Sequence, residues 1–249
     1  MRDMVVTIIG IDCATQAKNV GLALGTFDKG IARIDDVILG VGNVSLADII
    51  ADWVIGTQKV LLALDAPLGW PVSLGRELQE HEAGNPIKTE PNQLFRRSTD
   101  QFIKRMIGKQ PLDVGADRIA RTAHSALTLL DEIRKRTGEE LPLAWESDIQ
   151  KEISAIEVYP AATLIAHEIM APGYKRRESI NLRKRLLEDL RKLIGLPPDL
   201  SLMENNDDAL DAVICVLAGA DFLRGEVYCP IDQDLAKKEG WIWVRNYGE

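Results

Sequence analysis

The pattern of apolar and polar positions predicts an α/β domain whose first half contains three strands, a helix and a fourth strand. Apolar runs at residues 4–12, 20–27 and 30–41 are separated by short polar turns, which favours an antiparallel meander. Residues 45–56 then show apolar side chains at helical spacing, and residues 59–65 form a further buried strand. This order of elements is typical of an α/β domain.

The middle of the chain does not continue this succession of predicted strands and helices. Residues 67–152 are rich in Gly, Pro and charge, and they include one clear amphipathic helix at 115–138. We interpret residues 67–152 as a helical and loop insertion within a single domain that spans residues 1–249. After the insertion we expect a strand at 152–161, helices at 162–171, 178–195 and 205–225, and short strands at 226–230 and 240–245.

Composition indicates an ordinary globular protein. The 249 residues are 46% hydrophobic and 27% charged, and the net charge of −8 argues against a protein that coats nucleic acid non-specifically. The three cysteines form no CxxC pair, which indicates reduced thiols. No apolar stretch approaches the ~18 residues of a membrane-spanning helix. We therefore expect a cytoplasmic protein without a membrane partner.

Five carboxylates stand out because they lie in apolar surroundings. Asp12, Asp65 and Glu157 each lie at or near the end of an apolar strand, and Asp208 and Asp211 lie on an otherwise apolar helix. Taken singly, each has a structural explanation: a turn, an ion pair with an arginine of the insertion, or a favourable position near a helix start.

Taken together, the carboxylates predict a metal site. The carboxyl ends of strands in an α/β sheet converge on the ligand crevice, and residues three apart on a helix share a face. If the last helix packs on the sheet near those strand ends, four or five carboxylates share one cleft. Their mutual repulsion would be relieved by a divalent cation, and oxygen ligands without His or Cys suit Mg²⁺ or Mn²⁺.

Several motifs add a resemblance to this interpretation. "GIDCAT", "ALDAPLGWP", "RRSTD", "EVYPAATL" and "DDALDAVICVLAG" resemble a prokaryotic family of unknown function described as predicted RNase H-like nucleases. The order of elements is also similar to that of RuvC-type nucleases. The resemblance implies an RNase H-like mixed sheet, in which an antiparallel three-strand meander is followed by parallel strands and flanked by helices.

The resemblance also implies residue roles. Asp12 matches the metal ligand of the first strand, Asp65 the acid of the fourth strand, and Asp208 with Asp211 the acids of the last helix. Glu157 belongs to the "EVYP" pattern of the family and has no certain equivalent in the better-studied nucleases. The implied activity is hydrolysis of phosphodiester bonds by two metal ions about 3.5–4 Å apart. The catalytic candidates are Asp12, Asp65, Glu157, Asp208 and Asp211, and all except Glu157 are candidate metal ligands.

A nucleic-acid substrate requires positive charge near the site. Residues 94–126 carry seven Lys or Arg against three Asp, and residues 174–192 carry eight against three acids. These runs are either solvated helix faces with internal ion pairs or a surface that contacts phosphates. The expected partner is DNA or RNA, with a homodimer as a further option. The substrate-binding candidates are Arg96, Arg97, Asp100, Lys175 and Arg176.

Two other functions are compatible with the sequence. The actin–hexokinase superfamily shares the expected core, and "IDCAT" is similar to its D-x-G-x-T turn, although Cys13 and Ala14 replace the usual pattern. A chain of 249 residues also leaves little room for the second domain of those phosphotransfer proteins. The third option is a non-catalytic RNase H-like scaffold. Turnover of ATP would favour the phosphotransfer protein, and absence of metal-dependent binding or cleavage would favour the scaffold.

Overall fold

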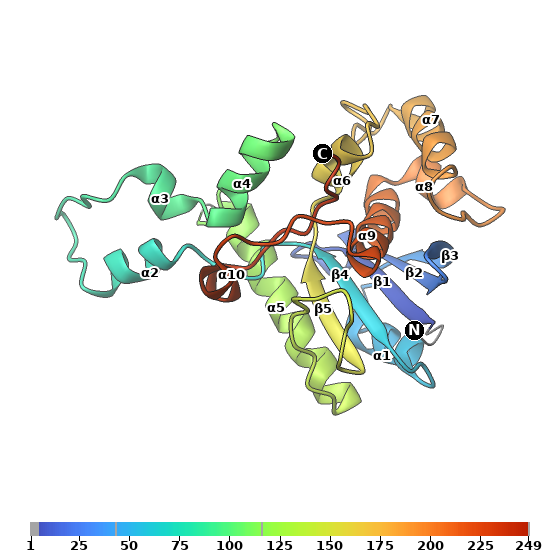
Figure 1. Cartoon of the computed structure of the whole chain (residues 1–249), viewed down its shortest axis with the longest axis horizontal. Coiled ribbons are helices and arrows are strands. Elements are labelled where there is room, and N and C mark those ends of the chain that lie inside the picture. The colour runs from blue at the N-terminus through green and yellow to red at the C-terminus, as the bar shows by residue number, and fades with distance from the viewer. Residues whose placement is uncertain (1–4, 43, 116, 249) are drawn as a thin grey trace.

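A five-stranded mixed sheet forms the centre of the computed structural model, which describes residues 5–42, 44–115 and 117–248 (Figure 1). The strand order is β3-β2-β1-β4-β5. β1, β2 and β3 are antiparallel neighbours, whereas β4 and β5 run parallel to β1. This topology confirms the expected RNase H-like fold. The strands are β1 (Val6–Asp12), β2 (Gly21–Asp28), β3 (Ile31–Leu39), β4 (Val60–Asp65) and β5 (Ile153–Glu157).

Helices cover both faces of the sheet, because the strands are apolar on both sides. Ile8 and Ala63 pack in the core under α9, whereas Ile9 and Leu62 pack in the core shared with α1 and α5. The helices are α1 (Leu46–Val54), α2 (Val72–Gln79), α3 (Pro91–Phe95), α4 (Ser98–Ile107), α5 (Asp117–Thr137), α6 (Pro160–Ala166), α7 (Ile180–Leu190), α8 (Ser201–Asn205), α9 (Asp207–Arg224) and α10 (Gln233–Glu239), with one 3₁₀ turn at Ala17–Asn19.

Two glycines allow α9 to lie directly against the sheet. A Cβ atom added at Gly10 would lie 2.0 Å from the carbonyl oxygen of Ala212, and one added at Gly21 would lie 2.0 Å from the carbonyl oxygen of Asp208. Real Cβ atoms do not approach backbone so closely, so larger residues would lift the helix. The first turns of α9 are thereby held next to the end of β1.

The segment expected as an insertion has two different parts. α2 and α3 form an arm that extends away from the sheet (Figure 1). α5, by contrast, belongs to the core, because Ala126, Leu130 and Ile133 are buried against the sheet and α1. The domain boundaries at 1–249 and 67–152 stay predictions.

Some element boundaries differ from the expectation. The helix expected at 162–171 ends at Ala166, and Glu168 adopts a left-handed backbone with φ 59° that a helix cannot continue through. The strands expected at 226–230 and 240–245 form only isolated bridges, Val227 with Arg245 and Ile242 with Glu157. The unforeseen helix α10 lies between them. Within the described ranges, no helix combines the length and apolar character needed to cross a membrane.

Both outer strands of the sheet are partly covered at their open edges. Gly195 forms a bridge to Arg33 of β3, where its carbonyl accepts from the backbone N–H of Ile34 at 2.7 Å. On the opposite side, Leu143 bridges to Ala155 of β5, and the carbonyl of Glu157 accepts from the N–H of Trp243 at 2.9 Å.

Candidate metal centre

Asp12 and Asp65 lie side by side because the two strands that carry them are parallel neighbours. Asp12 ends β1 and Asp65 ends β4, and the register of the pair places the two residues opposite each other. Gly10 and Ala63, two positions earlier, face α9, so alternation along the strands directs both carboxylates to the same face.

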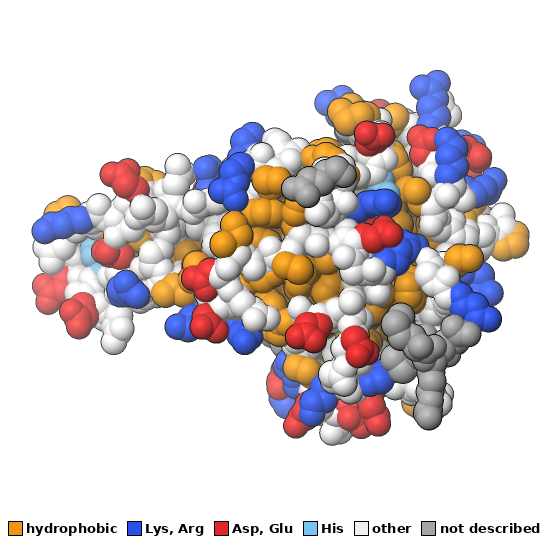
Figure 2. All heavy atoms as spheres, viewed as in Figure 1, with side chains coloured by type: hydrophobic (Ala, Val, Ile, Leu, Met, Phe, Trp, Pro, Cys, Tyr) orange, Lys and Arg blue, Asp and Glu red, His pale blue; other side chains and the backbone are white. Residues whose placement is uncertain are grey.

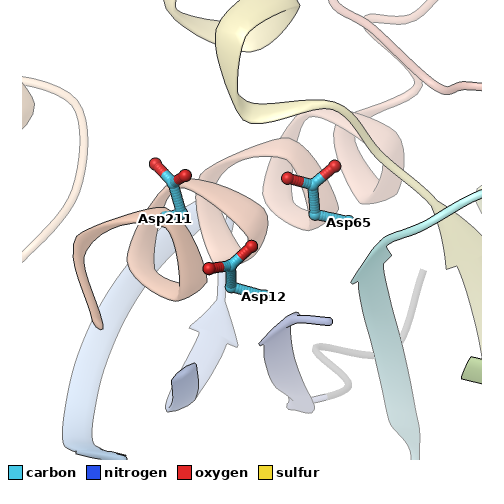
Figure 3. Close-up of side chains that lie close together, drawn as sticks. All are labelled: Asp12, Asp65 and Asp211. Carbon is cyan, nitrogen blue, oxygen red and sulfur yellow. The ribbon is translucent and has the colours of Figure 1, made fainter. Parts of the chain in front are cut away.

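Asp211 of α9, the helix that packs on the sheet, is the third carboxylate beside Asp12 and Asp65. One carboxylate oxygen from each of Asp12, Asp65 and Asp211 lies within 4.8 Å of the others, and Figure 3 shows the three side chains close together at the strand ends and α9. The Asp211 side chain is buried, with 1% of its surface exposed. The close packing over Gly10 and Gly21 brings Asp211 within reach of the strand ends. These three residues were all predicted from the sequence as metal ligands.

The charges of these carboxylates oppose one another. Burial raises the pKa of Asp12, and the neighbouring charges of Asp211 and Asp65 raise it further. Burial also raises the pKa of Asp65 to about 7, with Asp211 and Glu157 adding to the increase and Lys175 opposing it. The pKa of Asp211 is raised by burial as well, against the opposing effects of Lys175 and Tyr174. The mutual repulsion of the three carboxylates opposes their full ionisation, and a bound cation would relieve it.

Asp211 is held by two residues of the loop before α7. The hydroxyl of Tyr174 donates to Oδ1 of Asp211 at 2.5 Å, and the ammonium of Lys175 forms an ion pair with Oδ2. Oδ2 is buried, and its contact with Lys175 opposes the rise in the pKa of Asp211. The single charge of Lys175 faces three carboxylates, which leaves two negative charges uncompensated. That deficit, together with an all-oxygen donor set, fits a divalent cation such as Mg²⁺ or Mn²⁺.

Asp208 lies at the edge of this group. It occupies the first turn of α9, is partly exposed, and its charge contributes to raising the pKa of Asp12. Its own pKa is raised by burial, by Asp207 and by Asp211. The three-carboxylate group that could hold an ion does not include it.

Glu157 is placed differently from the other acids, because it is paired with Arg97. Two guanidinium nitrogens of Arg97 donate to the two carboxylate oxygens of Glu157 at 2.8 and 2.7 Å. The backbone N–H of Leu68 also donates to Glu157 at 2.9 Å, which fixes the turn that follows Asp65. Burial raises the pKa of Glu157, and Arg97 opposes this effect.

The predicted substrate-binding residues are divided between core and surface. Arg97 and Asp100 are buried and bonded to each other, so neither reaches a surface in this structure. Arg96 is partly exposed and pairs with Asp113 at 2.9 Å. Lys175 and Arg176 lie in the exposed loop before α7.

Two residues that support the centre were not anticipated from the sequence. Tyr174 contacts Asp211 directly. Arg183, counted in the basic run at 174–192, is 1% exposed, and its guanidinium donates to the carbonyls of Tyr174 and Arg176 at 2.6 and 2.9 Å. Arg183 therefore shapes the loop that presents Tyr174 and Lys175. Its position on the apolar face of α7, beside Leu186 and Leu187, is the signal that could have revealed it.

Comparisons with known proteins give a family and a structural likeness. A family model described as "Protein of unknown function (DUF429)" matches residues 10–235. No curated protein matches the chain. Among solved structures, RuvC of T. thermophilus in complex with a Holliday junction substrate is similar over 87% of this chain and 97% of that chain, at 13% identity and a TM-score of 0.30. At this TM-score the likeness carries no argument, and the fold rests on the sheet topology itself.

Proposed function

This chain belongs to the DUF429 family of proteins of unknown function, and we propose from its own site that it is a metal-dependent nuclease. One observation carries the proposal: three carboxylates from β1, β4 and α9 bring oxygens within 4.8 Å of one another, and Lys175 forms an ion pair with one of them. Their raised pKa values indicate a site built for a cation.

The residues have separate parts in the proposed reaction. Asp12, Asp65 and Asp211 would hold Mg²⁺ or Mn²⁺, with Asp208 as a further ligand at the exposed side. Bound metal would supply an activated water and stabilise the leaving oxygen of a phosphodiester. We assign Glu157 a positioning part, because its bonds to Arg97 and Leu68 hold the turn after Asp65 in place.

Nucleic acid is the proposed partner, and the exposed cations near the site are its proposed contacts. Lys175 and Arg176 lie on the loop next to Asp211, and Arg96 lies at the start of α4. Figure 2 shows Lys and Arg side chains spread over the face in view, with Asp and Glu among them. Phosphate contact on that face would therefore depend on a few local cations. A homodimer and a cytoplasmic location remain predictions of the sequence.

Cleavage by matched variants tests the proposal. We expect the wild-type protein to cleave nucleic acid only with Mg²⁺ or Mn²⁺, and Asp12→Asn to lose at least the ~10–100-fold that removal of an outer-shell metal group costs. Asp207→Asn is the control, because it removes a neighbouring carboxylate of α9 that lies outside the three-residue group. We expect it to retain wild-type cleavage and wild-type Mn²⁺ affinity by calorimetry.

Three results would contradict the proposal. Cleavage that survives in Asp12→Asn would show that the carboxylate group is not the catalytic site. ATP turnover without cleavage of nucleic acid would indicate a phosphotransfer protein with this core. Absence of both metal binding and cleavage in the wild type would indicate a non-catalytic scaffold.

A further inference from the structure

Two cavities lie on opposite sides of the sheet, one beside α1 and α5 and one beside α6, and each is lined by residues next to a carboxylate of the metal centre. The larger has a volume of about 580 Å³ and lies between the turn after β1, the start of α1 and the exposed side of α5. The other has a volume of about 370 Å³ and lies between α6 and the loop that carries Tyr174 and Lys175. Both volumes are within the range of about 300–1,000 Å³ that is usual for ligand sites.

Both cavities reach the carboxylates through residues that are continuous with them. Cys13 and Ala14 line the larger cavity and follow Asp12 directly in the chain. Tyr174 and Lys175 line the smaller cavity and contact Asp211. A chain molecule that occupied both cavities would therefore pass residues that lie next to Asp12 and Asp211.

Both cavities have apolar walls, and the larger also has polar residues that include Glu132 and Arg136. Their walls are mainly apolar, with Ala14, Val20 and Leu129 in the larger cavity and Leu164 and Ile169 in the smaller one. Such apolar walls can enclose the apolar faces of an unpaired base, as the walls of ligand sites usually do.

The openings of both cavities carry cations that suit phosphate. A further hollow of about 570 Å³ shares Thr15, His124 and Ser125 with the larger cavity and adds Arg121 to its lining. Lys109 and Lys175 line the smaller cavity. Within the described part of the chain, neither Arg121 nor Lys109 has an ion-pair partner. Each cavity thus combines a site for a base with a charge for its phosphate.

We infer that the substrate is single-stranded nucleic acid at the point of cleavage, with the bases on either side of the cleaved phosphate held in these two cavities. The inference rests on the proposed function and adds the class of substrate. A base that is stacked and paired within a duplex cannot enter a cavity between α5 and the turn after β1. Only a strand with unpaired bases places one base on each side of the carboxylates.

Binding measurements without cleavage test the inference. Fluorescence anisotropy would follow a labelled mixed-sequence 12-mer, as DNA and as RNA, on Asp12→Asn protein, both single-stranded and annealed to its complement. We expect the single strand to bind at least about tenfold more tightly, a difference of ~1.4 kcal/mol, because a paired base cannot enter either cavity. Ser125→Phe fills the larger cavity and Ala161→Phe the smaller one, and each should weaken single-strand binding about tenfold.

Matched controls make the result specific. Thr122→Phe adds the same bulk to α5 outside the cavity lining and should bind the single strand as before. Each filling variant is also made in protein that retains Asp12. Wild-type Mn²⁺ binding and a wild-type thermal midpoint in these proteins would show that the fold and the centre are intact. Equal or tighter binding of the duplex, undiminished binding by both filling variants, or no binding of any strand would overturn the inference.

The two proposals fail in different ways. Cavity-dependent binding of the single strand without metal-dependent cleavage by the wild type would reject the nuclease and keep the cavities as a strand-binding site. Metal-dependent cleavage that is unchanged in Ser125→Phe and Ala161→Phe would keep the nuclease and reject the cavities.

Discussion

Asp65 has to be ionised to hold a cation, yet its surroundings oppose that charge. It follows five buried residues of β4 and lies beside the carboxylates of Asp12 and Asp211. Lys175 provides part of the missing positive charge through Asp211. The metal-free protein therefore holds a cluster in which protons, Lys175 and a divalent ion are alternative sources of positive charge.

The pH dependence of stability should reveal this cluster. The pKa of Asp65 is raised to about 7 in the folded protein, above the value of about 3.9 of an unfolded chain. Folding therefore favours the protonated form, and the associated stability is present below about pH 4 and lost as the pH rises through about 7. We expect the thermal midpoint of chelator-treated protein to fall as the pH rises from about 4 to about 7.

A matched pair of variants identifies the residue responsible. Asp65→Asn, which cannot ionise at this position, should flatten the pH profile of the thermal midpoint. In the wild type, saturating Mn²⁺ should raise the thermal midpoint most at high pH. Asp207→Asn should keep the wild-type slope. An equally steep profile in Asp65→Asn would assign the effect to another group.

Lys175 should compete with metal for Asp211. Its ammonium forms an ion pair with Oδ2 of this carboxylate, so a bound ion has to approach a position next to a fixed positive charge. We expect Lys175→Met to bind Mn²⁺ more tightly than wild type by calorimetry, by roughly tenfold for each ~1.4 kcal/mol of repulsion removed. Arg176→Met, which changes the next residue of the loop, is the control. Weaker Mn²⁺ binding in Lys175→Met would show that the lysine supports the site instead.

At the scale of elements, the position of α9 decides whether the centre exists. Two of the predicted ligands are on strands whose register is set by backbone hydrogen bonds, but Asp211 depends on how closely a helix approaches them. The contacts of Gly10 and Gly21 with α9 set that approach.

Gly21→Ala tests this dependence. The added Cβ would lie 2.0 Å from the carbonyl oxygen of Asp208, so we expect destabilisation at the upper end of the ~1–3 kcal/mol usual for overpacking. Mn²⁺ affinity should fall as well, because α9 moves away from Asp12. Gly75→Ala is the control: it lies inside α2 with open space around it, and should be neutral or stabilising by up to ~1 kcal/mol. Urea unfolding of both variants provides the comparison.

The elements that periodicity predicted well are those with long apolar faces. The three-strand meander, β4, α5 and α9 all correspond to predicted segments. α10 was missed, and α2 and α3 were expected only as part of a helical and loop insertion, because these helices have five to eight residues each, too short for a repeating apolar pattern. The sequence pattern of the C-terminal segment with Trp241 and Trp243 predicts a strand, but in the structure its pairing at the sheet edge is limited to one bridge.

On the scale of the whole molecule, Arg97 joins parts of the chain that are far apart in sequence. Its guanidinium contacts Asp100 of α4, Glu157 of β5 and the carbonyl of Glu239 at the end of α10. The carboxylate of Glu239 in turn accepts from the backbone N–H of Val72 and Ser98, at 2.8 and 2.7 Å. The arm, the last strand and the C-terminal helix therefore share one buried network.

Removal of Arg97 should weaken the whole fold. Arg97→Met would leave the buried carboxylates of Asp100 and Glu157 without their cation, a change that typically costs ~3–5 kcal/mol. Arg96→Met is a control at the neighbouring position, because that arginine forms a partly exposed pair with Asp113 worth ~0–1 kcal/mol. Chemical denaturation would compare the free energies of unfolding of the two variants, and equal values would contradict the structural role of Arg97.

This network also shows where prediction from the sequence stops. Asp12 and Asp65 could be placed together because parallel strands bring their carboxyl ends to one edge. Nothing in the run "RRSTD" distinguishes Arg96 at the surface from Arg97 in the core, since the partner Glu157 is 60 residues away. The contact of Tyr174 with Asp211 spans 37 residues and arises from a loop without periodicity.

The covered edges of the sheet have a consequence for self-association. An open outer strand is a template on which a second chain can add a strand, which leads to dimers through continuous sheets or to aggregation. Here Gly195 occupies part of the β3 edge, and Pro142, Ala144 and Trp243 form backbone hydrogen bonds along β5. A second chain would meet an interrupted row of donors and acceptors on either side. Assembly of this protein with its own copies should therefore proceed through side-chain surfaces of helices or the arm, and not through strand addition.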